Sequence, residues 1–238
     1  MVEDFFSAEQ KSSYVRQMFN NVSHRYDFLN HLLSAGIDRH WRKRAIDVLQ
    51  LRSGEFFLDV ACGTGDLSIE AAKKNPARIA SLDFAEGMLR IFVEKGKNLD
   101  IAGKLNPVQA DAEKLPFADE TFDAAAVAFG VRNFGRLKEG LIELRRVVKK
   151  GGRVVILEFS RPQLFLVRQI YFFYFKRILP SIGRLVSGDR AAYSYLPDSV
   201  IVFPDGESFE NILREINFHE VRSFPLTFGV ATAYFGVR

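Results

Sequence analysis

The sequence predicts an α/β fold in which helices cover both faces of a mostly parallel, doubly wound sheet. The first observation is a strand–turn–helix unit: the apolar residues 56–60 precede Gly63 and Gly65, and helical spacing begins at Leu67. The second is that further apolar runs alternate with helical patterns as far as Glu158. This alternation is typical of a parallel sheet, whose ligands bind at the carboxyl ends of the strands.

The same patterns place the remaining elements in order. Residues 8–50 have helical spacing and are expected to form a helical cap ahead of the sheet. Strands are expected at residues 56–60, 78–83, 105–110, 122–129 and 153–158. Helices are expected from Leu67 and at residues 86–99, 137–148 and 208–216, with a turn at 149–152 and a closing hairpin at 220–224 and 227–236.

Length and composition indicate a single domain with a sizeable core. We expect its parts to be a cap (1–50), a nucleotide-binding core (51–160), a helical substrate-side insertion (161–200) and a C-terminal helix with hairpin (201–238). The net charge of +4 is too small to indicate a nucleic-acid partner. One cysteine and no secretory signal favour a cytoplasmic location, and the histidines lack the spacing of metal ligands, so no metal is expected.

The glycine turn constrains the ligand. A dinucleotide fingerprint wants a third glycine where Ser68 stands, which disfavours a dehydrogenase, and Asp66 would repel a phosphate. A second acid, Asp83, ends the next strand. Two strand-end acids around a glycine turn suit a ligand with a ribose diol and a positive charge but no phosphate. S-adenosylmethionine fits that description.

The stretch 164–179 is almost wholly apolar or aromatic, with Arg168, Lys176 and Arg177 interspersed. It is too short and too charged to span a bilayer. One interpretation is a buried helix that joins the fifth strand to the rest. The alternative is a helix that lies on a bilayer surface or walls an apolar tunnel, with its basic residues facing lipid headgroups.

Several motifs resemble a known family. The stretches Asp59-Val-Ala-Cys-Gly-Thr-Gly, Asp83 and Asp111-Ala-Glu resemble the nucleotide motifs of class I S-adenosylmethionine-dependent methyltransferases. Residues 26–42 and 146–160 are similar to the two signatures of the ubiquinone/menaquinone biosynthesis C-methyltransferases, and residues 129–133, 185–189 and 193–199 are also family-like. The resemblance implies a Rossmann-like, seven-stranded sheet with its last strand antiparallel and an N-terminal helical cap.

The resemblance also implies roles for individual residues. The cofactor-binding set would be Asp59, Gly63, Thr64, Gly65, Asp83, Asp111 and Ala112. The catalytic candidates are Arg132, Asn133 and His31, of which Arg132 and Asn133 would steer the quinol oxygen. The substrate-binding candidates are Tyr26, Asp27, Arg132 and Tyr195, and the aromatic run from Leu164 would receive an isoprenoid tail.

The implied reaction is methylation of a ring carbon of a polyprenyl quinol, demethylmenaquinol to menaquinol. The alternatives are a ubiquinone precursor or another small molecule as the acceptor, or a non-catalytic cofactor-binding module. The sequence leaves the oligomeric state open, a homodimer included. It also leaves open whether the chain makes transient peripheral contact with the inner face of the membrane.

Overall fold

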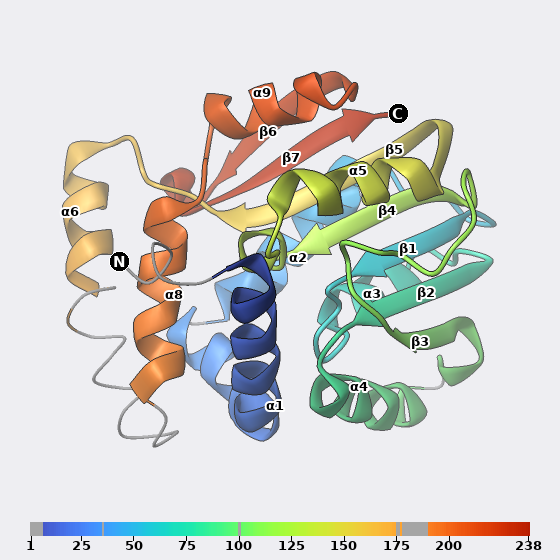
Figure 1. Cartoon of the computed structure of the whole chain (residues 1–238), viewed down its shortest axis with the longest axis horizontal. Helices are drawn as coiled ribbons and strands as arrows, with labels where there is room; N and C mark the ends of the chain where they lie inside the picture. Colours follow the sequence, from blue (N-terminus) through green and yellow to red (C-terminus); the bar gives the residue numbers. More distant parts are fainter. Residues whose placement is uncertain (1–6, 35, 100, 175–176, 178–189) are drawn as a thin grey trace.

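One seven-stranded sheet organises the chain (Figure 1). The computed structural model describes residues 7–34, 36–99, 101–174, 177 and 190–238. The strands, in spatial order, are β3 (Leu105–Gln109), β2 (Arg78–Asp83), β1 (Phe56–Val60), β4 (Phe122–Ala128), β5 (Val148–Phe159), β7 (Ala231–Val237) and β6 (His219–Leu226). β7 pairs antiparallel with both neighbours, whereas β1 to β5 are parallel. The predicted fold class is confirmed, including the antiparallel last strand.

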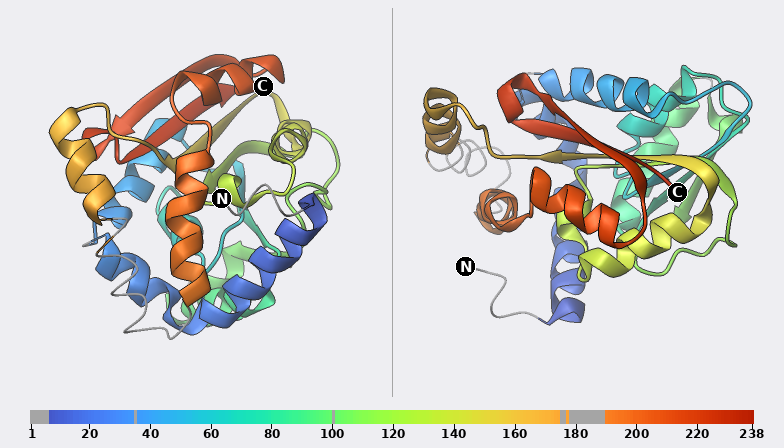
Figure 2. Two further views of the ribbon diagram at one scale, coloured as in Figure 1. Left: turned by 60° about the vertical axis from the view of Figure 1, so that its left-hand side comes forward. Right: turned by 90° about the horizontal axis from the view of Figure 1, so that it is seen from above.

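Helices lie on both faces of the sheet, and Figure 2 shows α2 and α3 on one side with α5 and α9 on the other. The described helices are α1 (Ala8–Leu33), α2 (Ile37–Leu49), α3 (Asp66–Ala72), α4 (Glu86–Asn98), α5 (Leu137–Val147), α6 (Phe165–Phe173), α8 (Arg190–Val202) and α9 (Glu207–Glu215). Short 3-10 turns are η2 (Ala102–Lys104), η3 (Val131–Asn133) and η5 (Thr227–Gly229).

The strand β4 shows why the sheet is covered twice. Ala124 and Ala126 belong to the core with α2 and α3, whereas Ala125 and Val127 belong to the core with α5 and α9. All four side chains are fully buried. Because successive strand residues point to opposite faces, a run that is apolar at every position must be buried on both.

Residues 8–49 are largely helical as expected, but only α1 lies over the edge of the sheet as a cap, whereas α2 packs on the face of the sheet beside α3. α1 packs between α4 and α8 at the carboxyl end of the sheet (Figure 1). Its Val15 and Met18 contact Tyr195 of α8, and its Asn20 Oδ1 accepts a hydrogen bond of 2.9 Å from Gly87 N. That bond satisfies a backbone N–H in the first turn of α4, which the helix itself leaves without a partner.

One strand differs from the prediction. The strand β5 begins at Val148, and the expected turn at 149–152 is an irregularity within it, where the register with β4 shifts. Gly151 takes a φ of +74°, and Gly151 N donates to Arg238 O at 2.8 Å. The helix α8 begins within the expected helical insertion (161–200) and runs through Pro197.

The interpretation of residues 164–179 as a buried helix is wrong for the described part. In α6 only Tyr171 is buried, whereas Phe165, Leu166, Ile170 and Phe173 are between 60% and 68% exposed. None of the described helices combines the length and the apolar character needed to cross a membrane.

Two glycines of the first turn differ in what surrounds them, and this difference predicts different costs of substitution. Gly65 has a φ of +86°, and a Cβ there would lie 1.8 Å from Cδ2 of the buried Phe92. We expect Gly65→Ala to lower the free energy of unfolding by about 3 kcal/mol, through backbone strain and overpacking together. At Gly63, where φ is +56° and a Cβ would meet only Tyr26 Cε1 at 4.0 Å, the loss should be about 1 kcal/mol.

Equilibrium unfolding in urea measures both changes. Equal losses for the two alanine variants would contradict the packing assigned to Phe92.

Candidate functional site

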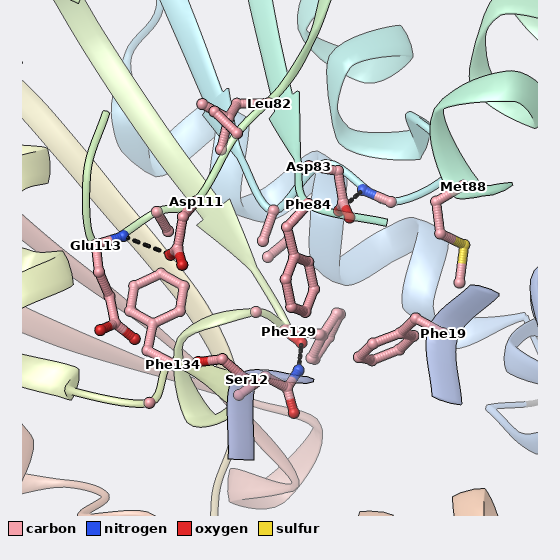
Figure 3. Close-up of a pocket in the computed structure, with 18 of the residues that line it drawn as sticks. Ser12, Phe19, Leu82, Asp83, Phe84, Met88, Asp111, Glu113, Phe129 and Phe134 are labelled. Carbon is pink, nitrogen blue, oxygen red and sulfur yellow. Dashed lines mark hydrogen bonds between the residues drawn. The ribbon is translucent and has the colours of Figure 1, made fainter. Parts of the chain in front are cut away.

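A cavity opens at the carboxyl ends of β1, β2, β3 and β4 and encloses about 620 Å³, its open mouth included. This is the edge where a doubly wound sheet binds ligands. Loops after the four strands form most of the wall, and α1 contributes Ser12, Phe19 and Tyr26 (Figure 3). The lining residues on the strand side are Ala61, Gly63, Leu82, Asp83, Phe84, Met88, Ala110, Asp111, Ala112, Glu113, Ala128, Phe129, Gly130, Asn133, Phe134 and Gly135.

The charged side chains of the wall are all acidic. Asp83, Asp111 and Glu113 are carboxylates, and the described lining contains no Lys, Arg or His. The rest is apolar or aromatic, as is typical of small-molecule pockets. A ligand with a positive charge and hydroxyl donors suits this wall, whereas a pyrophosphate would face carboxylates without a cation.

Asp83 fixes the glycine turn from the end of the neighbouring strand. Its Oδ2 accepts a hydrogen bond from Gly63 N at 2.8 Å, and its Oδ1 accepts one from Ala85 N at 2.9 Å. Burial raises the pKa of this carboxyl to about 6, although the backbone donors oppose that shift. The carboxylate is therefore held at the cavity wall while the backbone of Gly63 lies open to the ligand.

Asp59 lies beneath the glycine turn and outside the lining. Its Oδ2 accepts a hydrogen bond from Ser68 Oγ at 2.6 Å, and Ser68 Oγ lies 2.7 Å from Ser81 Oγ. Burial raises the pKa of Asp59 to about 7. The serine at the position of a third glycine therefore has a structural role, because its hydroxyl links Asp59 of β1 to Ser81 of β2 through buried hydrogen bonds. Gly65 is also absent from the lining and packs on Phe92 instead.

Thr64 faces α1 and α4, outside the lining. Its Oγ1 donates to Asp27 Oδ1 and accepts a hydrogen bond of 3.2 Å from Lys95 Nζ. Lys95 Nζ also lies 2.5 Å from Asp27 Oδ2 and 2.7 Å from Asp66 Oδ1. Two side chains predicted for different ligands, Asp27 and Thr64, therefore belong to one network that ties the cap to the glycine turn.

Asp111 and Ala112 follow β3 and line the cavity as the sequence predicts. Asp111 Oδ1 accepts a hydrogen bond of 2.9 Å from Glu113 N, which fixes the carboxylate at the turn. Figure 3 shows the Asp111 carboxylate and the side chain of Phe134 on the same side of the cavity. Glu113 also lines it, and its Oε1 accepts from Arg136 N at 2.9 Å.

The exit of β4 places Asn133 at the wall. Phe129 has a φ of +57°, and its carbonyl oxygen accepts from Arg132 Nη1 at 2.6 Å and from Asn133 Nδ2 at 3.4 Å. Turning the Asn133 amide over would set two acceptors against each other, so Oδ1 must point away from that carbonyl. Among the described residues, no hydrogen-bond partner contacts this buried Oδ1.

Arg132 is buried and engaged away from the lining. Its Nη1 forms an ion pair of 2.7 Å with Glu158 Oε1, and its guanidinium lies over the ring of Phe159. Burial raises the pKa of Glu158, although Arg132 opposes the shift. The guanidinium of Arg132 is thus engaged by the carboxylate of Glu158. Direct contact of Arg132 with a quinol oxygen stays a prediction.

The remaining candidates are divided. Tyr26 lines the cavity, whereas Tyr195 is buried against Tyr14 of α1, with ring centroids 6.1 Å apart, and does not line it. His31 lies on α1, and its side chain is outside the described part. The described residues from Leu164 to Tyr174 also stay outside the lining, which separates the expected tail-binding run from the cavity.

Sequence reasoning missed several wall residues. Phe84 directly follows Asp83, and Met88 lies one helical turn after it, so the position of Asp83 was a usable signal. Glu113 lies within the quoted Asp111 motif. Phe19 and Ser12 come from α1, and no local pattern predicts which face of a cap meets the sheet.

Solved structures share the fold. A S-adenosylmethionine-dependent methyltransferase from Aquifex aeolicus superposes with a TM-score of 0.60 at 18% identity, covering 82% of this chain and 88% of that one. The [4+2]-cyclase SpnF superposes with a TM-score of 0.56 at 21% identity, covering 67% and 63%. Because a cyclase shares the architecture, the fold alone leaves the reaction undetermined.

Sequence comparison is more specific. The chain is 44% identical to the ubiquinone/menaquinone biosynthesis C-methyltransferase UbiE of Geobacter sulfurreducens, over 95% of this chain and 89% of that protein. It is 42% identical to the demethylmenaquinone methyltransferase of Bacteroides fragilis, over 98% and 96%. Residues 7–238 also match the model of the ubiE/COQ5 methyltransferase family. The chain therefore belongs to the ubiE/COQ5 methyltransferase family.

Proposed function

We propose that this enzyme transfers the methyl group of S-adenosylmethionine to a ring carbon of a polyprenyl quinol, converting demethylmenaquinol to menaquinol. The choice of cofactor rests on the cavity wall, which contains three carboxylates, the backbone of Gly63 and, among its described residues, no cation. The acceptor rests on relatives of more than 40% identity whose names specify quinone biosynthesis. The polyprenyl tail of this acceptor partitions into a bilayer, so we propose that the enzyme works at the inner face of the cell membrane.

The residues present fit this cofactor. Asp83 lines the cavity, and each of its carboxylate oxygens can accept a further hydrogen bond beside the one from the backbone, so ribose hydroxyls would donate to it. Phe84 and Met88 offer an apolar slot for a purine, and Asp111 with the N–H of Ala112 would bind its polar edge. The backbone of Gly63, without a Cβ, permits close approach of the amino-acid end. Asp59, Thr64 and Gly65 would act on the cofactor through the turn that they hold.

When bound, the cofactor would supply an electrophilic methyl group on a positively charged sulfur, with a neutral thioether as the leaving group for attack by the ring carbon. The chain's residues then have to align the ring and exclude water. Phe129, Phe134 and Phe19 provide apolar surface around that position. The ring carbon would then lose its hydrogen as a proton, which passes to solvent, and this loss restores the aromatic quinol.

Asn133 is the residue we assign to the quinol oxygen. Its Oδ1 is an acceptor directed away from Phe129 O, so it can accept the hydrogen bond of a ring hydroxyl. As the ring donates electrons to the methyl group, that O–H becomes more acidic and the hydrogen bond strengthens. Arg132 and Glu158 would act as positioning residues, since they hold the Phe129 carbonyl to which Asn133 is bound.

A ubiquinone precursor remains the second candidate for the acceptor. The relative from Geobacter sulfurreducens carries both quinones in its name, whereas that from Bacteroides fragilis carries only demethylmenaquinone. The acid-lined cavity would hold the same cofactor in either reaction.

Cofactor affinity should depend on the ionised Asp83. We expect Asp83→Asn to weaken binding of S-adenosylhomocysteine at least about a hundredfold, because charged hydrogen bonds to ribose and to Gly63 N are both affected. Since burial raises the pKa to about 6, affinity should also decline as the pH falls from 7 to 5, whereas a carboxyl of ordinary pKa would stay ionised over that range.

Isothermal titration calorimetry across this pH range measures both effects. Asp119→Asn, at an exposed carboxylate paired with Arg146, is the matched control and should bind like the unaltered enzyme. Near-normal affinity in Asp83→Asn would reject the site.

Asn133→Ala should separate catalysis from cofactor binding. We expect turnover of the quinol to fall about tenfold to a hundredfold, the value of one hydrogen bond to a group gaining charge. Affinity for S-adenosylhomocysteine should change less than about twofold, because the carboxylates of the wall are unaltered. Asn106→Ala on β3, which leaves the cavity untouched, is the control for loss of an amide; equal rates in the two variants would contradict the assignment.

The proposed reaction is tested with methyl-labelled S-adenosylmethionine and chemically reduced demethylmenaquinone. Mass spectrometry should locate the label on the ring carbon, and a ubiquinone-type quinol in competition ranks the two acceptors. Label on a ring oxygen, or none on either acceptor, would contradict the proposal.

A further inference from the structure

The helix α6 presents an apolar face to solvent. This face, called the α6 face below, consists of Leu164, Phe165, Leu166, Ile170 and Phe173, each between 58% and 68% exposed. In Figures 1 and 2 the helix lies at the margin of the molecule, outside α8. A cluster of large apolar side chains so exposed marks an interaction site.

The opposite side of α6 is anchored, which fixes the orientation of the face. Tyr171 is 6% exposed and packs in a cluster with the buried Val200 of α8. Phe159, at the end of β5, and Val230, directly before β7, belong to the same cluster. Because α6 is held through Tyr171, the α6 face points outward as a structural feature of the described chain.

A further exposed apolar side chain, Phe228, lies near the segment that precedes α6. Phe228 in η5 is 72% exposed and has a φ of +57°, a conformation unusual for an aromatic residue. The next residue, Gly229, accepts a hydrogen bond of 2.9 Å from Ser160 Oγ and lies close to Pro162. η5 is thereby tied to the segment that leads into α6.

The charge of residues 161–188, the stretch that contains α6, indicates the kind of partner. Residues 161–188 contain Arg161, Arg168, Lys176, Arg177 and Arg184 and not one Asp or Glu. Arg161 pairs with Asp205, and the guanidinium of the exposed Arg168 lies 5.9 Å from the ring centroid of Phe165 on the α6 face. Apolar and basic groups so combined suit an anionic lipid surface, where each basic residue adds to binding.

A second copy of this chain fits the face less well. A two-fold dimer would bring the same patch of both copies together, and an acid-free basic segment would then oppose itself. Lipid headgroups of negative charge provide the complement that the segment lacks.

We propose that the α6 face and Phe228 dock the enzyme on an anionic bilayer, with the carboxyl edge of the sheet near the surface. The inference deepens the proposed function, since it supplies the route by which a polyprenyl quinol dissolved in lipid reaches the enzyme. In this proposal the α6 face contacts the lipid of the bilayer and does not line the cavity.

Flotation with vesicles of phosphatidylcholine containing about one third phosphatidylglycerol tests the surface directly. The double variant Phe165→Gln/Phe173→Gln should lower partitioning at least about tenfold, because two inserted rings are lost. Leu99→Gln/Ile142→Gln, at two exposed apolar residues near α4 and in α5, is the matched control and should partition normally. Neutralising Arg168 and Arg177 should cost about fivefold each at low salt, and Arg90→Gln/Lys150→Gln is the control of equal charge.

An assay with a soluble acceptor that carries a single isoprene unit distinguishes failure of membrane docking from failure of methyl transfer. The Phe165/Phe173 variant should methylate it at the unaltered rate, so loss of vesicle binding with retained turnover supports the docking surface. Equal partitioning of variant and control, absence of vesicle binding by the unaltered enzyme, or loss of a dimer in sedimentation without change in vesicle binding would overturn it. Vesicle binding as expected without methylation of any acceptor would refute the proposed reaction and leave the surface standing.

Discussion

The carboxylate of Asp83 is the interaction on which the site depends. It ends β2, and it accepts backbone hydrogen bonds from Gly63 after β1 and from Ala85 before α4. One buried charge thus sets the spacing between two strand ends and the start of a helix. The cost of its burial appears in a pKa raised to about 6, even though the backbone N–H donors lower it. A hydrogen bond from a ligand hydroxyl would lower this pKa further.

The helical cap completes what Asp83 begins. Asn20 binds the first turn of α4, and Asp27 meets Thr64 and Lys95 beside the glycine turn. α1 is therefore fastened to the elements that Asp83 aligns, and its Phe19 and Tyr26 close the cavity. The arrangement couples the wall of the acceptor side to the turn that would hold the cofactor.

The sequence predicts the sheet well because its signal is physical. A strand buried on both faces must be apolar at every position, and the carboxyl ends of parallel strands meet at one edge. Gly63, Asp83, Asp111, Ala112 and Asn133 therefore converge on the cavity as predicted. Their distances along the chain do not matter, since the topology brings them together.

Other features depend on packing that no local pattern contains. Glu158 pairs with Arg132 across adjacent strand ends, and only the fold shows that this guanidinium is engaged. An apolar run such as that of α6 looks the same whether it is covered or exposed, so burial was the wrong interpretation there. The helix α8 continues through Pro197, although proline normally breaks a helix, and α8 packs against α1 and η3.

A crystal structure of the chain with S-adenosylhomocysteine would test whether the cofactor binds at Asp83 and the glycine turn. We expect ribose hydroxyls within hydrogen-bond distance of Asp83, the purine between Phe84 and the Asp111 turn, and the sulfur facing the side chain of Asn133. A ligand bound away from Asp83, or one whose ribose contacts neither that carboxylate nor the glycine turn, would contradict this expectation.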